Sequence, residues 1–383
     1  MIGAIIGDIV GSRYESWKNN IFTKDFQLFD GRCRFTDDTV MTLGTAEVCI
    51  AGFSFDSDEN QEEVKFVSNV YKKWCQKFPH RGFGGWTKAW FYSDDIISSE
   101  SSFANGAAMR VSPVAWFSVT LEQAEAKAKF VSEITHNSEG VKGAQAIAAA
   151  TFMAIEREGG YYISSKKRAT KDEIKNYIEK IYGYNLSIAL FDAKEYYHHL
   201  EPRRSQASKS VPAAILAFIN GDDFEDVIRT AVSLGGDTDT IAAMAGSIAE
   251  AYYGIPEDIQ SHIWAYMFPE LSERVKLFER ERKRFNEGKY LTARNAAMKV
   301  CQLSRGTGDS FGPAAWQDAL DVGTEENEFN FWSDIVYWSN YLFYLNHLDR
   351  YAILNEKFDY FSCLKVEYGS SGNLDNLFNN FTD

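Results

Sequence analysis

Two short acidic segments, each followed by an apolar helical stretch, most strongly constrain how this chain can fold. Residues 36–39 read Thr-Asp-Asp-Thr and precede the apolar residues 40–48; residues 237–240 read Asp-Thr-Asp-Thr and precede residues 241–250. A single Asp or Thr at a helix start is explained by N-capping, because its side chain accepts a hydrogen bond from a free backbone N–H. Capping alone does not explain two aspartates with threonines in both segments.

A metal site is the alternative explanation for these segments. Four carboxylates that meet in a buried place repel one another strongly unless a multivalent cation neutralises them. Carboxylate and hydroxyl oxygens are hard ligands that select Mg²⁺, Mn²⁺ or Ca²⁺ rather than zinc. From the residues alone, double capping and a metal site both remain open, because the sequence does not show that the segments meet.

The first predicted helix carries a stripe of glycines. Gly3, Gly7 and Gly11 recur every four residues and would let another helix approach closely. Since glycine inside a helix costs about 1 kcal/mol relative to alanine, three of them indicate a packing requirement. Asp8, Ser12 and Glu15, at i, i+4 and i+7, would lie on a neighbouring face of this helix.

Helical periods dominate residues 1–290, and we expect an all-α body there. Residues 170–183 combine a capping-box spacing with Gly183 as a C-terminal stop, and residues 143–158 predict a buried, Ala-rich helix. Residues 271–285 predict another helix that ends near Gly288. We expect residues 291–383 to form a separate helical, aromatic-rich extension that packs on the body or binds a protein partner.

Composition limits the classes of partner. The chain has 40 Lys and Arg against 54 Asp and Glu, a net charge of −14, so direct nucleic-acid binding and docking on an anionic membrane are not expected. Five scattered cysteines without a Cys-x-x-Cys pair argue against a disulfide framework. The start of the sequence lacks the basic region of a signal peptide, and we expect a cytoplasmic protein.

Five motifs in order resemble those of the ADP-ribosylglycohydrolase family, which includes the dinitrogenase-reductase-activating glycohydrolases. They are Gly-Asp-Ile-Val-Gly-Ser-Arg-Tyr-Glu at 7–15, Phe-Thr-Asp-Asp-Thr at 35–39, Asn-Gly-Ala-Ala-Met-Arg-Val at 105–111, Thr-His at 135–136 and Leu-Gly-Gly-Asp-Thr-Asp-Thr at 234–240. The resemblance covers residues 1–290, and residues 291–383 match no part of the family known to us.

The resemblance implies a compact multi-helix bundle with two divalent cations, Mg²⁺ or Mn²⁺, in a central cleft. Carried over by motif position, the metal ligands would be Thr36, Asp37, Asp38, Asp237, Asp239 and Thr240. Glu15 matches an acidic position proposed to act on the water or the substrate, and the catalytic residues would accordingly be Glu15, Asp38 and Asp237.

A second set of positions matches the family's contacts to the ADP-ribose moiety: Ser102, Phe103, Asn105, Gly106 and His136. Many relatives have Gly-Ser-Tyr-Gly-Asn-Gly in this loop, so Phe103 lacks a tyrosine hydroxyl and Ala104 replaces a glycine. For His136, a substrate contact or a structural role is favoured over that of a catalytic base, because the family places its metals elsewhere.

The function that the resemblance implies is metal-dependent hydrolysis of the glycosidic bond between ADP-ribose and a modified side chain. The substrate would be an ADP-ribosylated protein or a small ADP-ribosyl compound such as O-acetyl-ADP-ribose. A non-catalytic protein that binds ADP-ribose or a partner is the other alternative, and the intact set of ligand types favours an enzyme. The linkage, the choice between Mg²⁺ and Mn²⁺, and the oligomeric state stay open.

Overall fold

The computed structural model describes residues 1–16, 18–51, 61–98, 102–157, 167–189 and 205–286. All elements assigned within these ranges are helices, which confirms the predicted all-α class. They are α1 (Ile2–Gly11), α2 (Asp37–Ala51), α3 (Gln61–Lys77), α4 (Gly85–Phe91), α5 (Gly106–Met109), α6 (Ser112–Trp116), α7 (Leu121–Glu133), α8 (Ser138–Ala154), α9 (Lys171–Tyr182), α11 (Ala207–Asn220), α12 (Phe224–Ser233), α13 (Thr238–Tyr253), α14 (Glu257–His262), the 3-10 helix η1 (Ile263–Ala265) and α15 (Pro269–Asn286). The extension predicted for 291–383 lies outside the described residues.

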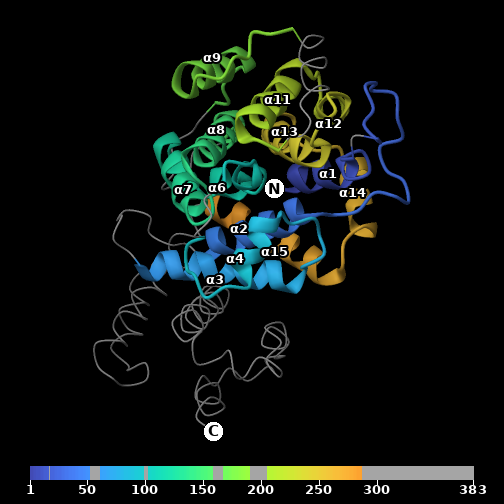
Figure 1. Cartoon of the computed structure of the whole chain (residues 1–383). Helices are drawn as coiled ribbons and strands as arrows, with labels where there is room; N and C mark the ends of the chain where they lie inside the picture. The colour runs from blue at the N-terminus through green and yellow to red at the C-terminus, as the bar shows by residue number, and fades with distance from the viewer. Residues whose placement is uncertain (17, 52–60, 99–101, 158–166, 190–204, 287–383) are drawn as a thin grey trace, which may run out of the picture.

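Helix α13 is central to the bundle. It packs against α1, α8, α11 and α12, which Figure 1 shows arranged around it. All thirteen positions from Thr238 to Glu250 are buried, as expected for a helix that is mostly apolar on every side. Helix α1 is buried along its full length as well.

A second group of helices lies below the first in Figure 1. Helix α2 packs against α3 and α15, and it also contacts α1 and α6 of the upper group. The N-terminal end of α2 therefore faces the layer that contains α1 and α13. The two acidic segments of the sequence meet at this junction.

The helix predicted at 170–183 is confirmed with its capping signals. The Thr170 side chain accepts from the Glu173 N–H, the Glu173 side chain accepts from the Thr170 N–H, and Gly183 is left-handed with φ of 66°. The prediction that a helix spans 271–285 is confirmed by α15.

The boundaries of two helices differ from the sequence prediction. The helix expected at 143–158 is α8, which begins at Ser138 because the Asn137 side chain accepts hydrogen bonds from the N–H groups of Glu139 and Gly140. It ends at Ala154, where Ile155 becomes extended. Glu15 does not share a helix face with Asp8, because α1 ends at Gly11 and Glu15 comes after the turn at residues 12–14.

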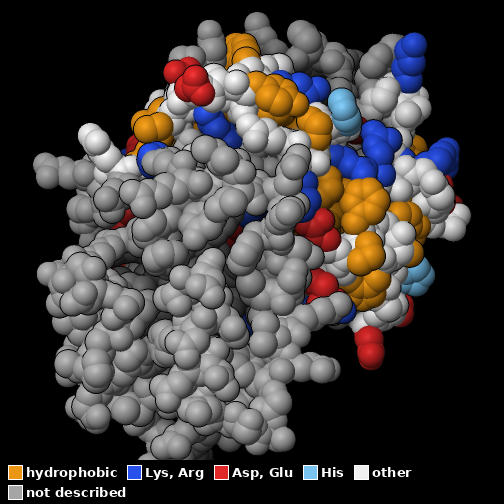
Figure 2. Space-filling model, turned by 90° about the horizontal axis from the view of Figure 1, so that it is seen from below, with side chains coloured by type: hydrophobic (Ala, Val, Ile, Leu, Met, Phe, Trp, Pro, Cys, Tyr) orange, Lys and Arg blue, Asp and Glu red, His pale blue; other side chains and the backbone are white. Residues whose placement is uncertain are grey.

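No helix in the described ranges is long and apolar enough to cross a bilayer. On the described part of the face in Figure 2, hydrophobic side chains lie between basic and acidic ones. A mixed surface of this kind is ordinary for a protein in which most surface area is still contributed by apolar atoms.

Candidate metal centre

The close approach of α1 to α13 brings the first acidic residue into place. A Cβ atom on Gly7 would lie 2.1 Å from the carbonyl oxygen of Ala242, so only glycine fits at this crossing. The Gly3 N–H also donates to Glu250 Oε2 of α13 at 2.8 Å. Asp8, the residue after Gly7, is consequently held beside the start of α13. The packing requirement inferred from the glycine stripe is confirmed.

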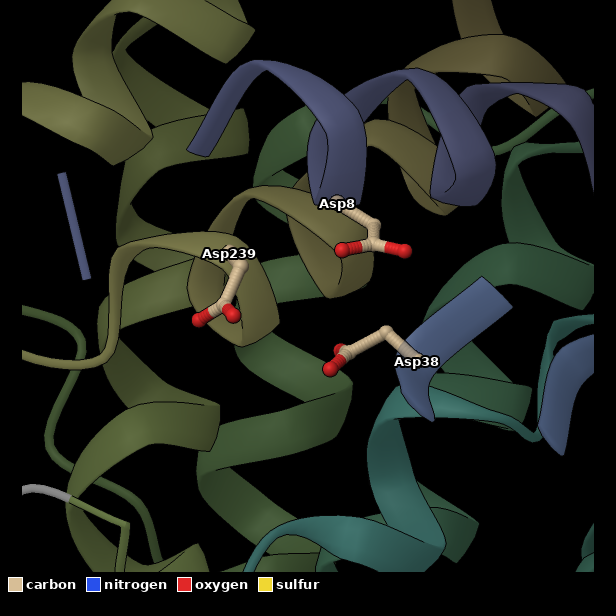
Figure 3. Close-up of side chains that lie close together, drawn as sticks. All are labelled: Asp8, Asp38 and Asp239. Atoms are coloured by element: carbon tan, nitrogen blue, oxygen red, sulfur yellow. The ribbon is translucent and has the colours of Figure 1, made fainter. Parts of the chain in front are cut away.

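Three carboxylates from three helices converge at this point. Asp8 comes from α1, Asp38 from the first turn of α2 and Asp239 from the first turn of α13, and their side chains point toward a common centre in Figure 3. One carboxylate oxygen of each lies within 4.8 Å of the others, and the three residues are 0%, 2% and 4% exposed. The two acidic segments therefore meet in the folded chain.

A second carboxylate group overlaps the first. Glu15, Asp237 and Asp239 also offer oxygens within 4.8 Å of one another, so Asp239 belongs to both groups. Each group has the three oxygen donors from which a hard divalent cation can be bound, and a shared carboxylate can contact two neighbouring cations.

Asp8 is already committed to hydrogen bonds within the protein. Its Oδ2 accepts from Thr36 N at 2.9 Å, Thr39 N at 3.1 Å and Thr39 Oγ1 at 2.5 Å, and its Oδ1 accepts from Thr36 Oγ1 at 2.7 Å. Asp8 thus fixes the turn that leads into α2. The sequence-based set of site residues did not include it, although the carboxylate row beside the glycine stripe was a signal.

Asp38 provides the observation that tests whether a cation fits. Its Oδ2 lies 3.3 Å from the Thr240 hydroxyl, which donates to it, whereas its Oδ1 is buried and has no hydrogen-bond partner. A buried carboxylate oxygen without a donor costs free energy unless a cation contacts it. The donor set here is carboxylate and hydroxyl oxygen, so these residues fit Mg²⁺ or Mn²⁺.

The electrostatics of the centre also favour a cation. Burial, together with the charges of Asp239 and Asp8, holds the pKa of Asp38 well above its usual range. Burial and the nearby charges of Asp237 and Glu15 do the same to the pKa of Asp239. A divalent ion at this place would stabilise the ionised carboxylates, because an opposite charge favours the charged form.

Asp37 is half-buried and lies beside the two groups rather than in either. Its N–H donates to the carbonyl oxygen of Arg81 at 2.7 Å. Gly82, with φ of 105°, leaves room for this side chain, because a Cβ there would lie 2.7 Å from Asp37 Oδ1. Burial and the charge of Asp8 raise the pKa of Asp37 to about 8.

Asn105 connects the predicted substrate loop to the centre. Its Nδ2 donates to Asp237 Oδ2 at 2.7 Å, so Asn105 orients a carboxylate of the second group. Thr240, the remaining predicted ligand, donates its N–H to Asp239 Oδ1 at 2.9 Å. Thr36 and Thr240 therefore both lie at the centre, where their hydroxyls contact Asp8 and Asp38.

The loop around Ser102 lies against His136. The Ser102 N–H donates to Thr135 O at 3.1 Å, and the Asn137 N–H donates to Ser102 O at 2.9 Å. Gly106 faces the imidazole, since a Cβ on Gly106 would lie 3.2 Å from His136 Nε2. The structure thus brings Ser102, Gly106 and His136 together.

A chain of hydrogen bonds links Arg110 to His136. Arg110 Nη2 donates to Thr135 Oγ1 at 2.8 Å, and this hydroxyl lies 2.8 Å from His136 Nδ1. Arg110 can only donate, so the Thr135 hydroxyl accepts from it and keeps a second lone pair and its own proton for the hydrogen bond with His136 Nδ1. Burial, with a smaller effect of the Arg110 charge, keeps the pKa of His136 well below its usual value. The lowered pKa favours the neutral ring, whose Nε2 lies on the side of Gly106.

Phe103 lies at the surface of the protein. It is 40% exposed and packs edge-to-face against Trp86, itself 46% exposed, with ring centroids 5.9 Å apart. Its carbonyl oxygen accepts from the Ala207 N–H. The sequence analysis identified Phe103 but not Trp86, because Trp86 belongs to none of the motifs.

The chain is similar to several known proteins. Residues 1–286 match the family model described as ADP-ribosylglycohydrolase. Human ADP-ribosylhydrolase ARH3 is 27% identical over 335 residues, covering 70% of this chain and 88% of its own. ADP-ribosylarginine hydrolase Tri1 of Pseudomonas putida is 25% identical over 314 residues, covering 73% of this chain and 77% of its own. A solved structure titled as an ADP-ribosylglycohydrolase-related protein complex aligns with a TM-score of 0.49 at 20% identity, over 76% of this chain and 97% of its own.

Proposed function

The chain belongs to the ADP-ribosylglycohydrolase family, and from that premise we propose that it hydrolyses the glycosidic bond between ADP-ribose and a modified side chain. The observation that carries the proposal is the pair of carboxylate groups that share Asp239, together with the unpartnered buried oxygen of Asp38. Two divalent cations, Mg²⁺ or Mn²⁺, would be held by Thr36, Asp37, Asp38, Asp237, Asp239 and Thr240, with Asp8 and Glu15 completing the two carboxylate groups. When bound, such ions can orient the ribose hydroxyls and lower the pKa of a water molecule.

Glu15 is the proposed proton acceptor in this reaction. Cleavage at the anomeric carbon passes through an oxocarbenium-like state, and the attacking water must lose a proton. Glu15 is half-buried and its carboxylate lies beside those of Asp237 and Asp239, so its oxygen can take that proton next to the centre. Asp38 and Asp237 would hold their oxygens toward the reacting ribose.

The loop and His136 would bind the ADP-ribose moiety. His136 Nε2 can form a hydrogen bond with a polar atom of the substrate, Gly106 lies beside it, and the backbone of Ser102 pairs with that of His136. The exposed faces of Phe103 and Trp86 suit contact with a planar or apolar part of the ligand. Asn105 would act indirectly, because its amide is used to orient Asp237.

The test is release of ADP-ribose by the purified full chain. Peptides that carry arginine-linked or serine-linked ADP-ribose, and O-acetyl-ADP-ribose, would each be incubated with Mg²⁺, with Mn²⁺ and with EDTA. We expect release that requires the metal from at least one peptide, which would also identify the linkage. Release from O-acetyl-ADP-ribose alone would replace a protein substrate by a small molecule. Binding of ADP-ribose without any release would indicate a binding protein and overturn the proposal.

A further inference from the structure

The side chain of Asn20 connects two segments that carry carboxylates of the second group. Its Nδ2 donates to Tyr14 O at 2.5 Å and to Gly236 O at 3.3 Å, while its Oδ1 accepts from Gly236 N at 2.9 Å. Tyr14 precedes Glu15, and Gly236 precedes Asp237. One half-buried amide therefore holds the backbone next to both carboxylates.

The segment before Asp237 needs such external support. Gly235 and Gly236 both adopt positive φ, 73° and 75°, which side chains other than glycine rarely adopt. Two consecutive glycines have little intrinsic preference for one conformation and lose much backbone entropy when they are ordered. The ring of Phe22 covers Gly235, because a Cβ there would lie 2.7 Å from Phe22 Cε1, and Asn20 supplies hydrogen bonds at Gly236.

Holding these segments together opposes a repulsion. Glu15, Asp237 and Asp239 have oxygens within 4.8 Å of one another, and like charges at this separation push the segments apart. Asn20 is neutral, so it joins the two backbones without adding charge to the group. Hydrogen bonds to backbone groups are also unaffected by which cation is bound.

We propose that Asn20 is a positioning residue for the second carboxylate group, which sets the spacing of Glu15 and Asp237 for a divalent cation. The metal part of this inference rests on the proposed function, whereas the backbone contacts do not. Nothing in the motifs marks Asn20, since it lies in the irregular stretch after the first helix.

Hydrogen exchange of the metal-free chain tests the backbone part. In Asn20→Ala, the Gly236 amide loses its acceptor, and we expect faster exchange in a peptide that covers residues 234–238. Asn20→Asp retains the Oδ1 acceptor, so exchange there stays close to wild type. The exposed neighbour Asn19 is the matched control, and Asn19→Ala leaves the exchange unchanged. Wild-type exchange in Asn20→Ala would overturn the inference.

Titration with Mn²⁺ alone, followed by the EPR signal of the free ion, tests the metal part. We expect two ions per wild-type chain, and in Asn20→Ala an affinity about tenfold to a hundredfold lower for one of them, as for other groups that orient ligands. Asn20→Asp also loses both hydrogen bonds that the amide donates. We therefore expect weaker binding of one ion in this variant as well, although its added charge favours a cation.

The outcomes separate this inference from the proposed function. Two wild-type affinities in both Asn20 variants would overturn the role of Asn20 and leave the proposed function intact. Fewer than two bound ions in the wild-type chain would overturn the dinuclear site itself and, with it, the metal role of Asn20. Weakening of one ion in the Asn20 variants but not in Asn19→Ala would support both.

Discussion

The aspartates at the centre differ in how their oxygens are used. Asp8 accepts four hydrogen bonds from Thr36 and Thr39, whereas Asp38 retains a buried Oδ1 without a partner. The hydrogen bonds of Asp8 hold the turn that leads into α2, although Asp8 still belongs to the first carboxylate group, whereas Asp38 Oδ1 is open to a cation. Residue type and spacing could not separate these roles, because the donors to Asp8 come from Thr36 and Thr39, which are distant from it in the sequence.

Glu15 is the residue on which turnover should depend most directly. We expect Glu15→Gln to lower kcat about a hundredfold to ten-thousandfold, because glutamine keeps the size but cannot accept the proton from water. The measurement is the rate of ADP-ribose release at saturating Mg²⁺. The number of bound Mn²⁺ ions is determined in parallel. Glu257→Gln, at the exposed start of α14, is the control. Full turnover in Glu15→Gln would remove Glu15 from the mechanism.

The protonation of His136 should depend on Thr135. In Thr135→Val, Nδ1 loses its hydrogen-bond partner, and we expect its ¹⁵N resonance to move away from the wild-type position. Thr135→Ser keeps the hydroxyl and should restore the wild-type spectrum. The chain has six histidines, so the resonance is assigned by its loss in His136→Gln. An unchanged spectrum in Thr135→Val would contradict the hydrogen-bond chain from Arg110.

At the scale of elements, helical periodicity and capping signals predicted several helices well. The helix at 170–183 follows local rules, since its cap and its glycine stop are defined by neighbouring residues. The predicted start of α8 is five residues late. The prediction followed the apolar run and did not use the N-cap signal of Asn137. The prediction that Asp8 and Glu15 share a helix face was wrong, because α1 ends before Glu15.

Gly7 should be the most sensitive point of the α1–α13 contact. A Cβ in Gly7→Ala would meet the Ala242 backbone, which cannot move aside like a flexible side chain. We expect a loss of about 1–3 kcal/mol in the free energy of unfolding, measured with urea, since overpacking has a cost of this size. Gly31→Ala is the matched control, because a Cβ added at Gly31 would have no neighbouring atom within 4 Å. Equal stability of the two variants would show that the helices can separate without cost.

At the scale of the whole molecule, the chain concentrates acidic groups in its interior while its net charge is already −14. The pKa of Asp37 is raised to about 8, so the folded metal-free chain binds this proton more tightly than the unfolded chain does. Its contribution to stability is present at low pH and is lost as the pH rises toward about 8. A divalent cation held by Asp37, as proposed, would compete with the same proton.

Metal stabilisation should therefore increase with pH. The increase in Tm on replacing EDTA with Mg²⁺ should be larger at about pH 8.5 than at about pH 6. The reason is that deprotonated carboxylates bind the ion. Asp37→Asn should flatten this dependence, whereas Asp25→Asn, at an exposed position, should not. The measurement is thermal unfolding across the pH series. A Tm difference that shrinks as pH rises would contradict the raised pKa of Asp37.

The amino-acid sequence was sufficient to predict the all-α class, the family and most of the residues at the centre. Helix periods, caps and the Asp-Thr segments are local patterns, and local patterns reflect backbone and side-chain chemistry within a few residues. Motif order then carried the remaining assignments, including Glu15 and the loop at 102–106. The boundary proposed near residue 290 and the role of 291–383 stay predictions.

The folded arrangement was needed to establish which of these side chains meet and what each one contacts. Asp8 and Asp38 are thirty residues apart, and Asn20 reaches Gly236 across 216 positions. Such contacts depend on how closely α1 packs on α13 and how α2 faces them, which no pattern within one segment encodes. The arrangement of buried charge, and the different roles of Asp8, Asp38 and Asn105, follow from that packing.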